Sequence, residues 1–244
     1  WFAMEYDQWF NFILPALSQT NCIIPLGGSS NHIRTSMLRD LGGWDAFNVT
    51  EDADLGVRLA RLKLKTATIA SRTGEEAPIH LGAWLRQRSR WMKGWMQTLI
   101  VHDRHWRSLL RDLGWPAFIG LHIYVGSMIF SAPLHAAFLI SFLASLVTLQ
   151  LPDTFGWSSM LTVGIFVLGY LGPILLVIAG LDRLQRLDLL PAQLLLPFYW
   201  LLHGVAMLMA AWELVVSPFA WSKTRHGQTR VTRSAIRPAE AQAE

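Results

Sequence analysis

The sequence predicts a mixed α and β domain over residues 1–112, followed by an all-helical membrane region. Three stretches without Asp, Glu, Lys or Arg predict the membrane region, namely residues 113–152, 154–181 and 189–212. Each exceeds the roughly 20 residues that a helix needs to cross a bilayer. Residues 1–112 instead mix charge with short apolar stretches and glycine pairs, as a folded unit in contact with water does. The mean hydropathy of +0.31 fits this division into two regions.

The beginning of the chain predicts an amphipathic helix over residues 1–17. Glu5, Asp7 and Gln8 lie off its apolar stripe, and Pro15 predicts that the helix ends there or soon after. The apolar side chains at helical spacing are Phe2, Tyr6, Trp9, Phe10, Ile13, Leu14 and Leu17. Such a face suits either a bilayer surface or the domain's own sheet, and both interpretations stay open.

Two short segments of the first domain predict β-strands. "CIIPLGGSSNHIR", residues 22–34, is typical of an apolar strand that runs into a glycine turn and a polar loop. "KTATIAS", residues 65–71, predicts a second strand, followed by the loop "GEEAP". With the helices around them, these strands define the α+β class.

Two helices complete the predicted first domain. Thr50 is a suitable N-cap, and Glu51 and Asp52 fill the first turn, where carboxylates complement the helix dipole. One face of that helix carries Leu55, Leu59 and Leu62. A second helix is expected over residues 81–101.

The first uncharged run is too long for one simple span. As a single helix, residues 113–152 would measure about 60 Å, roughly twice the hydrocarbon core. Pro133 is the predicted break. Either residues 117–131 lie along the interface before one span over 133–151, or the run is a hairpin of two short spans.

The remaining runs predict one clear span and one irregular segment. Residues 157–181 have the length of a membrane helix. The third run contains Pro191 and Pro197, carries Glu213 and ends at Pro218, which predicts helices that lie in the inner leaflet or dip into it. A chain of this kind belongs in the inner or plasma membrane.

Lysine and arginine predict the orientation of the membrane region. The first domain, the loop with Arg183 and Arg186, and the tail over residues 218–244 are all positive, so all three are expected to be cytoplasmic. One span out, one span back and a third run within the inner leaflet would place all three basic segments in the cytoplasm. Three simple spans would place the basic tail outside.

The segment "NVTEDADLG" carries two adjacent carboxylates at a helix start. Dipole complementation explains them structurally, while catalysis would require one to accept a proton, with a pKa raised toward neutrality. The helix N-terminus favours the ionised form, so burial or the neighbouring Glu51 would have to raise the pKa of Asp52. The local physics permits a base without requiring one.

The segment "RQRSRWMKGW", residues 86–95, combines four cations with two tryptophans. On a helix, Gln87, Arg90 and Trp91 share a face, with Arg86 and Lys93 beside it. Guanidinium forks suit phosphate oxygens, an amide adds a directional bond, and an indole offers a flat surface for a sugar ring. A basic and aromatic belt at a membrane surface is an equally good interpretation of the spacing alone.

The combination of motifs resembles a known family. "TED" at 50–52 followed by "QRSRW" at 87–91 resembles the second half of a membrane-embedded, cellulose-synthase-like family 2 inverting glycosyltransferase. "GGSSNHIR", "GGWDAFNVTEDADLGVRLAR" and "QRSRWMKGWMQT" resemble one branch of those enzymes nearly throughout. "PFAWSKTRHG" at 218–227 resembles their cytoplasmic gating segment. The resemblance covers roughly residues 1–230 and implies the acceptor-side half of a GT-A-like domain.

The resemblance also implies roles for particular residues. It assigns Asp52, with Glu51 beside it, as the general base that deprotonates the acceptor hydroxyl. The implied substrate-binding residues are Gln87, Arg90, Trp91, Arg88, Ser29, Asn31, His32 and Asp45. The implied gating residues are Trp221, Lys223, Thr224 and His226, for which a solvated basic tail is the plain alternative. The implied units are 1–112, 113–217 and 218–244.

The implied partners are a nucleotide-sugar donor, expected to be a UDP-sugar, a saccharide acceptor and membrane lipid, without nucleic acid. The family binds uracil and a divalent cation, Mg or Mn, through aspartates that include a D-x-D motif, and no such motif precedes the TED motif here. We therefore expect the cation's ligands to lie outside this chain, and the chain to be an inactive fragment of a longer enzyme.

Three other functions stay open beside a processive polysaccharide synthase. A non-processive transferase to a lipid-linked acceptor would keep the base and the arginine. A membrane-anchored partner subunit with decayed chemistry would keep only the architecture. A transporter is disfavoured because the uncharged runs offer almost no ionisable group to couple an ion, Glu213 being the exception.

Overall fold

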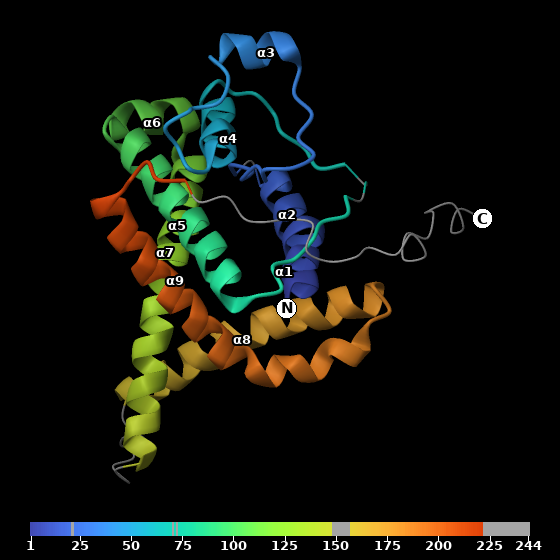
Figure 1. Ribbon diagram of the computed structural model, residues 1–244, viewed down its shortest axis with the longest axis vertical. Coiled ribbons are helices and arrows are strands. Elements are labelled where there is room, and N and C mark those ends of the chain that lie inside the picture. Colours follow the sequence, from blue (N-terminus) through green and yellow to red (C-terminus); the bar gives the residue numbers. More distant parts are fainter. Residues whose placement is uncertain (21, 70, 72, 148–156, 222–244) are drawn as a thin grey trace, which may run out of the picture.

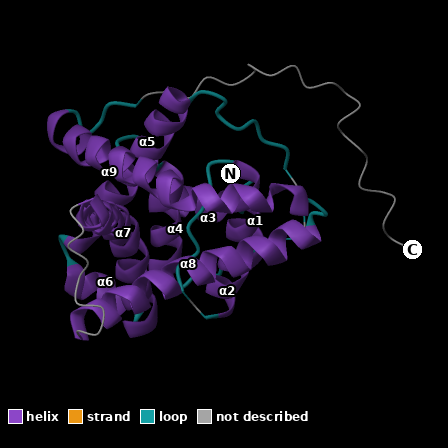
Figure 2. Cartoon of the chain, turned by 90° about the horizontal axis from the view of Figure 1, so that it is seen from below, coloured by secondary structure: helices purple, strands orange, loops and turns teal. Residues whose placement is uncertain are grey.

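The computed structural model describes residues 1–221 except positions 21, 70, 72 and 148–156 (Figure 1). The elements in chain order are α1 (Phe2–Gln8), the π-helical turn η1 (Trp9–Ile13), α2 (Leu14–Gln19), α3 (Thr35–Asp40), α4 (Glu51–Arg61), α5 (Leu81–Asp103), α6 (Trp106–Leu113), α7 (Trp115–Val147), α8 (Trp157–Arg183), the 3-10 segment η2 (Leu187–Leu195) and α9 (Leu196–Val216). Helices and loops make up the whole described part of the chain, with no strand (Figure 2).

The predicted α+β class is therefore wrong. Ile23 and Ile24 are buried, as a core strand would be, but the segment lies against a helix. A Cβ added at Gly56 of α4 would stand 2.9 Å from the Ile24 carbonyl oxygen, so helix and extended segment touch directly. The second predicted strand is solvent-exposed, with Ile69 74% accessible. Neither segment has the neighbouring strand that a β-ladder requires.

The first three elements form one nearly continuous helix that ends at Gln19, one turn beyond Pro15. Pro15 lies in the first turn of α2, directly after the π-helical turn η1. Met4 packs on Val177 and Leu181 of α8. This helix therefore packs on the membrane region and not on a sheet.

Helix α7 is continuous through Pro133, so the predicted break there is wrong. The proline removes one backbone hydrogen bond, which apolar membrane-type helices tolerate when neighbouring helices support them. That support lies close by, because His135 contacts the Pro197 carbonyl at 3.1 Å and the Tyr170 hydroxyl at 3.2 Å. The 33 residues span about 50 Å.

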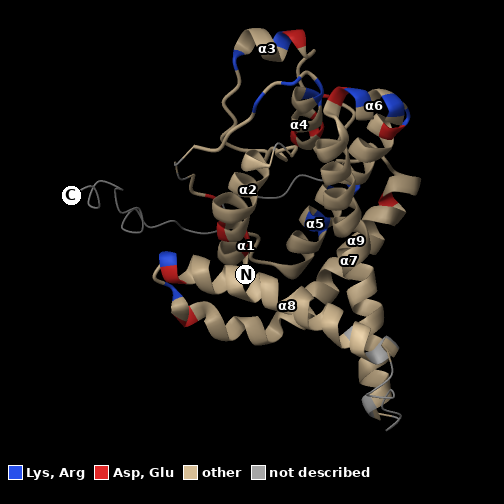
Figure 3. Ribbon diagram, turned by 180° about the vertical axis from the view of Figure 1, so that it is seen from behind, with Lys and Arg blue, Asp and Glu red and all other residues tan. Residues whose placement is uncertain are grey.

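In the part of the chain that the structure describes, three helical stretches are long and apolar enough to cross a membrane, over residues 115–145, 163–183 and 187–216. Helix α8 runs across α7 in both Figure 1 and Figure 2. Charged residues gather on α3, α4, α6 and the loop after α8, while the far end of α7 carries none (Figure 3).

The main core joins α4, α5, α6 and the first half of α7. Its completely buried members include Val57, Leu109 and Val125, which pack with Trp95. Helix α9 lies alongside α5, where Met92 and Met96 meet the small residues Ala206 and Ala210. Helix α5 thus stands between the start of α4 and the end of α9.

Candidate active site

The loop that precedes α4 is fastened along one face of α5. The Asn48 amide donates to Thr98 Oγ1 at 2.8 Å, and the Val49 N–H donates to Gln97 Oε1 at 3.3 Å. Arg90 Nη1 donates to the Val49 carbonyl at 3.4 Å. Residues 48–50 are buried there. The helix predicted to begin after Thr50 and the helix predicted over 81–101 are confirmed as α4 and α5, and their contact presents the TED motif.

Gly94 allows this close approach. A Cβ at position 94 would overlap the side chain of Thr50, so the loop can lie flat on α5 only because α5 has no side chain there. Thr50 occupies the predicted N-cap position but makes no capping bond with its side chain. Its hydroxyl faces Asn48 Oδ1 at 3.4 Å instead.

Asp52 lies half-buried at the start of α4. Its Oδ1 accepts the Ala53 N–H at 2.8 Å, and its Oδ2 lies 3.4 Å from the position that a Cβ at Gly28 would take. Burial raises the pKa of Asp52, and the Glu51 carboxylate adds to the increase, while the Ala53 N–H and Arg90 oppose it. The pKa of Asp52 therefore lies above the ordinary aspartate value, which is the direction that a general base requires.

Gln87 and Arg90 bring unsatisfied polar atoms to the same helix. Gln87 Oε1 and Arg90 Nε are buried without a hydrogen-bond partner among the described residues. Burial lowers the pKa of Arg90 and the carboxylates of Asp52 and Glu51 raise it, so the cation and both acids lie within electrostatic reach. A buried polar atom without a partner costs about 1 to 3 kcal/mol, which a bound ligand could recover.

Arg88 contacts the Trp91 ring and helix α1. The Arg88 guanidinium lies 4.8 Å from the Trp91 ring centroid and 5.2 Å from that of Phe2. It also forms an ion pair with Glu5 of α1. The structure therefore engages Arg88 with α1, whereas Arg90 is the guanidinium that acts on Asp52.

The candidate acceptor loop is tied to the loop over residues 73–75. Ser29 donates to the Glu75 carboxylate, and Ser30 lies 2.6 Å from Thr73 Oγ1. The Asn31 amide donates to the Gly27 carbonyl, and His32 is exposed. Within this loop, Gly28 comes next to Asp52.

Asp45 lies in the turn before the TED motif, and Trp221 is the one implied gating residue within the described part of the chain. Asp45 Oδ1 accepts the Phe47 N–H at 2.9 Å and so shapes the turn that leads to the TED motif. Trp221 is 56% exposed. Lys223, Thr224 and His226 lie outside the described residues.

The sequence did not identify Gln97 as a functional candidate, and it placed Lys93 only beside the face of the motif residues. Lys93 is only 1% exposed, and its Nζ lies 3.2 Å from Glu213 Oε2. The signal was a polar stripe at i, i+4 and i+8 on one face of α5, formed by Ser89, Lys93 and Gln97. The Lys93 bond also gives Glu213, the acid that follows the third uncharged run, a structural partner.

The expected cation finds no ligand set in the described part of the chain, where no three His, Cys, Asp or Glu side chains gather. Asp52 and Glu51 alone do not provide one. Enzymes of the family resembled here commonly use divalent cations, and we derive no step through one.

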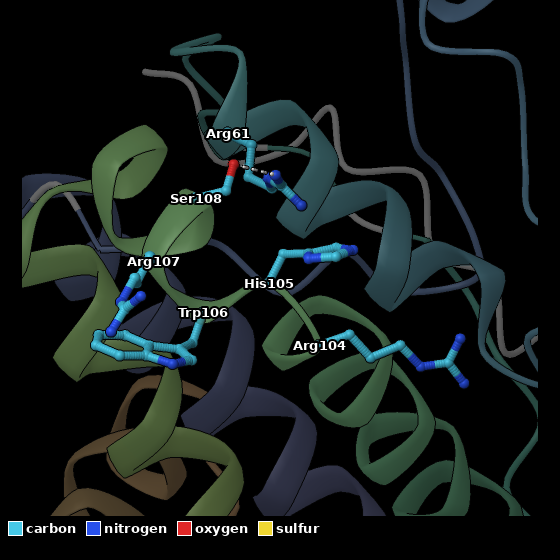
Figure 4. A pocket seen from close by; sticks show the side chains of 6 residues that line it. All are labelled: Arg61, Arg104, His105, Trp106, Arg107 and Ser108. Atoms are coloured by element: carbon cyan, nitrogen blue, oxygen red, sulfur yellow. Dashed lines mark hydrogen bonds between the residues drawn. The ribbon is translucent and has the colours of Figure 1, made fainter.

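A hollow of about 460 Å³ lies at the turn between α5 and α6, away from the motif residues. Its lining consists of Arg61, Arg104, His105, Trp106, Arg107 and Ser108. In Figure 4, Arg104 and Arg107 extend to opposite sides, and Arg61 is already paired with Asp112 at 2.8 Å. These side chains do not converge on one ligand, so the seam between α4 and α5 is the stronger candidate site.

Comparison with known proteins identifies the family. The model of "Glycosyl transferase family group 2" matches residues 1–222. A probable glucomannan 4-beta-mannosyltransferase 7 of Oryza sativa subsp. japonica is 26% identical over 213 residues, 84% of this chain and 32% of the rice protein. The probable glycosyltransferase YdaM of Bacillus subtilis (strain 168) is 36% identical over 73 residues, 30% of this chain and 17% of that protein.

The chain thus spans no more than about a third of the length of either relative. No solved structure matches it. The family match covers both the seam between α4 and α5 and the apolar helices. This chain belongs to glycosyl transferase family group 2.

Proposed function

We propose that the protein transfers a sugar from a nucleotide-sugar donor to a saccharide acceptor, with Asp52 as the general base. The observation that carries the proposal is the pairing of Asp52, whose pKa is raised by burial, with Arg90, whose Nε is buried without a partner in the described structure. A base and a phosphate-binding cation are the two groups that this reaction requires.

The reaction follows as a single displacement. The acceptor hydroxyl oxygen attacks the anomeric carbon of the donor while its proton passes to the Asp52 carboxylate. The bond between the anomeric carbon and the phosphate oxygen breaks, and the electron pair leaves with the nucleoside diphosphate. Arg90 and the Gln87 amide are suited to hold the departing diphosphate. One displacement inverts the anomeric configuration.

The acceptor is proposed to be a growing polysaccharide. The family match and the rice relative, named as a glucomannan mannosyltransferase, support this choice. The donor is proposed to be a UDP-sugar. A non-processive transferase to a lipid-linked acceptor is the alternative, and product length separates the two.

The active site is proposed to face the cytoplasm, on the same side as both basic segments. Two contacts support this placement. Arg183, in the loop end of α8, lies 3.3 Å from Asp7 of α1, and Lys93 donates to the Ala220 carbonyl at 2.8 Å. The loop after α8 and the start of the tail therefore both join the 1–112 unit. Modification of cysteines placed in the loop over 184–186 from one side of sealed vesicles tests the sidedness.

The decisive experiment measures donor turnover by the full-length protein in membranes, with a panel of nucleotide sugars and products sized on a gel. We expect one donor to yield a long product, and Asp52→Asn to abolish it while the protein stays folded. A single-sugar product on lipid would favour the non-processive enzyme. No turnover from any donor by folded protein supplied with Mg²⁺ or Mn²⁺ would overturn the proposal in favour of an inactive partner subunit.

A further inference from the structure

Two segments far apart in the sequence meet on α5. The loop over residues 45–50, here called the TED loop, leads to the TED motif. Residues 217–221, here called the exit segment, follow α9. Both are fastened by side chains of α5, and Figure 1 shows the end of α9 beside that helix. The exit segment leads directly into the residues that were proposed to form a gating segment.

Gln97 joins the two segments through one amide group. Its Oε1 accepts the Val49 N–H at 3.3 Å, and its Nε2 donates to the Pro218 carbonyl at 2.7 Å. The side chain is 8% exposed, so water competes little for either bond. The amide group is planar, so its oxygen and nitrogen move together. If the Pro218 carbonyl shifts and Gln97 follows it, the bond between Gln97 Oε1 and the Val49 N–H shifts as well.

Lys93 holds the exit segment one turn earlier on the same face. Its Nζ donates to the Ala220 carbonyl at 2.8 Å and to the Ser217 carbonyl at 3.5 Å. A buried ammonium needs such partners, and Glu213 supplies the counter-charge, itself bound by Ser89 at 3.3 Å. The exit segment therefore has a defined seat on α5.

A ring contact connects the two segments directly. Phe47 of the TED loop and Phe219 of the exit segment meet edge to face, with ring centroids 6.1 Å apart. Phe47 is 72% exposed and Phe219 is 66% exposed, so this contact is separate from the buried bonds of Gln97. Two independent contacts thus link the same pair of segments.

We propose that Gln97 is a positioning residue that couples the exit segment to Asp52. When the exit segment is seated on Gln97 and Lys93, Gln97 holds the TED loop in the geometry that presents the base. When the exit segment leaves its seat, the Val49 contact loosens and the base loses its position. This inference rests on the proposed function for its effect on rate, but the coupling itself is a property of the fold.

The first test follows the coupling without any substrate. Hydrogen exchange of the full-length protein is compared between wild type and Lys93→Gln, because Lys93 makes no recorded bond with the TED loop in the described structure. We expect faster exchange both in a peptide over 217–221 and in a peptide over 45–52. Faster exchange in the first peptide alone would overturn the coupling, as would no change in either.

Phe219→Ala serves as the second variant, because an exposed ring can be removed without endangering the fold. It should also raise exchange over 45–52, and unchanged protection there in a folded protein would count against the coupling. These measurements hold even if no donor is turned over, so failure of the proposed function and failure of the coupling remain distinguishable.

The second test uses rate. Gln97→Glu keeps an acceptor for the Val49 N–H but places a carboxylate against the Pro218 carbonyl. The matched control is Gln185→Glu, which removes a similar amide bond to the Asp182 carbonyl in the exposed loop after α8. We expect Gln97→Glu to lower kcat about ten- to a hundredfold, as small misplacements do, with little change in donor KM. Equal kcat for both variants would overturn the positioning role.

Discussion

Asp52 and Asp54 stand two residues apart at the start of α4, but they belong to different regions of the molecule. Asp52 faces Gly28 and Arg90 at the seam with α5. Asp54 is 4% exposed and binds Arg58 Nε at 2.6 Å and His102 Nε2 at 3.0 Å. The Asp52 carboxylate accepts only a backbone N–H in the described structure, while the Asp54 carboxylate ties α4 to α5 through His102.

The pKa values of the two groups separate for the same reason. Burial raises the pKa of both carboxyls. At Asp54 the His102 and Arg58 bonds outweigh burial and hold the pKa below its ordinary value. At Asp52 the backbone N–H and Arg90 do not outweigh burial and Glu51. The comparison teaches that partners, and not burial alone, decide which of the two carboxyls has a raised pKa and which a lowered one.

The largest expected effect is that of Asp52→Asn on the rate. Loss of a general base lowers kcat about 10²- to 10⁴-fold, because the acceptor hydroxyl keeps its proton. Steady-state transfer with the full-length enzyme measures this, with the thermal unfolding midpoint as the control for folding. If Asp54→Asn lowered kcat equally with its fold intact, the two carboxylates would not differ in role.

Asp54→Asn should act on stability. Breaking a buried pair costs about 3 kcal/mol of unfolding free energy, at the low end of the range because Arg58 is 22% exposed on its side chain. The folded pKa of Asp54 is depressed, so its contribution is present above the unfolded pKa of about 3.9 and is lost as pH falls through the folded value. Thermal unfolding in detergent measures both effects, and a variant as stable as wild type would contradict the anchor role.

Arg90→Lys sharpens the Asp52 side of the comparison. Lysine keeps the charge but loses the guanidinium fork, which costs about 1.5 to 3 kcal/mol and roughly ten- to a hundredfold in kcat if the bond acts in the transition state. Arg88→Lys is the neighbouring control, because Arg88 is engaged by Glu5. Unchanged turnover in Arg90→Lys would remove Arg90 from the site.

The smallest effect concerns pH. The proposed base must be ionised to accept a proton, so we expect the rate to fall as pH drops through the pKa of Asp52, which lies above the ordinary aspartate value. Burial is the main cause of the increase and Glu51 adds to it, so Glu51→Gln should move the acid limb of the kcat profile to lower pH. An acid limb that stays in place would show that Glu51 does not act on the base.

The α4 and α5 helices and their motifs were predictable because their signals are local. The carboxylates at the start of α4 and the spacing of Leu55 and Leu59 identify an amphipathic helix, and both leucines are buried. Leu62 was placed on the same face but lies just beyond the helix and is 55% exposed. A repeat specifies a face only as far as the helix continues.

The strands and the break at Pro133 could not be judged locally. An apolar segment such as 22–26 is compatible with a strand or with an extended chain packed on a helix, and only its neighbour decides. In the structure that neighbour is Gly56 of α4. Pro133, considered alone, likewise predicts a break. In the structure α7 continues through it, and His135 nearby contacts both α8 and α9.

The sequence by itself determined the family, the two helices that carry the motifs and the apolar stretches, because each depends on residue identity and short-range spacing. Only the tertiary structure decided which charged groups meet. Three features depend on contacts between residues that are distant in the sequence. They are the opposite pKa shifts of Asp52 and Asp54, the two bonds of Gln97 and the burial of Lys93. Electrostatic and hydrogen-bond energies depend on distance in space, which spacing along the chain does not contain.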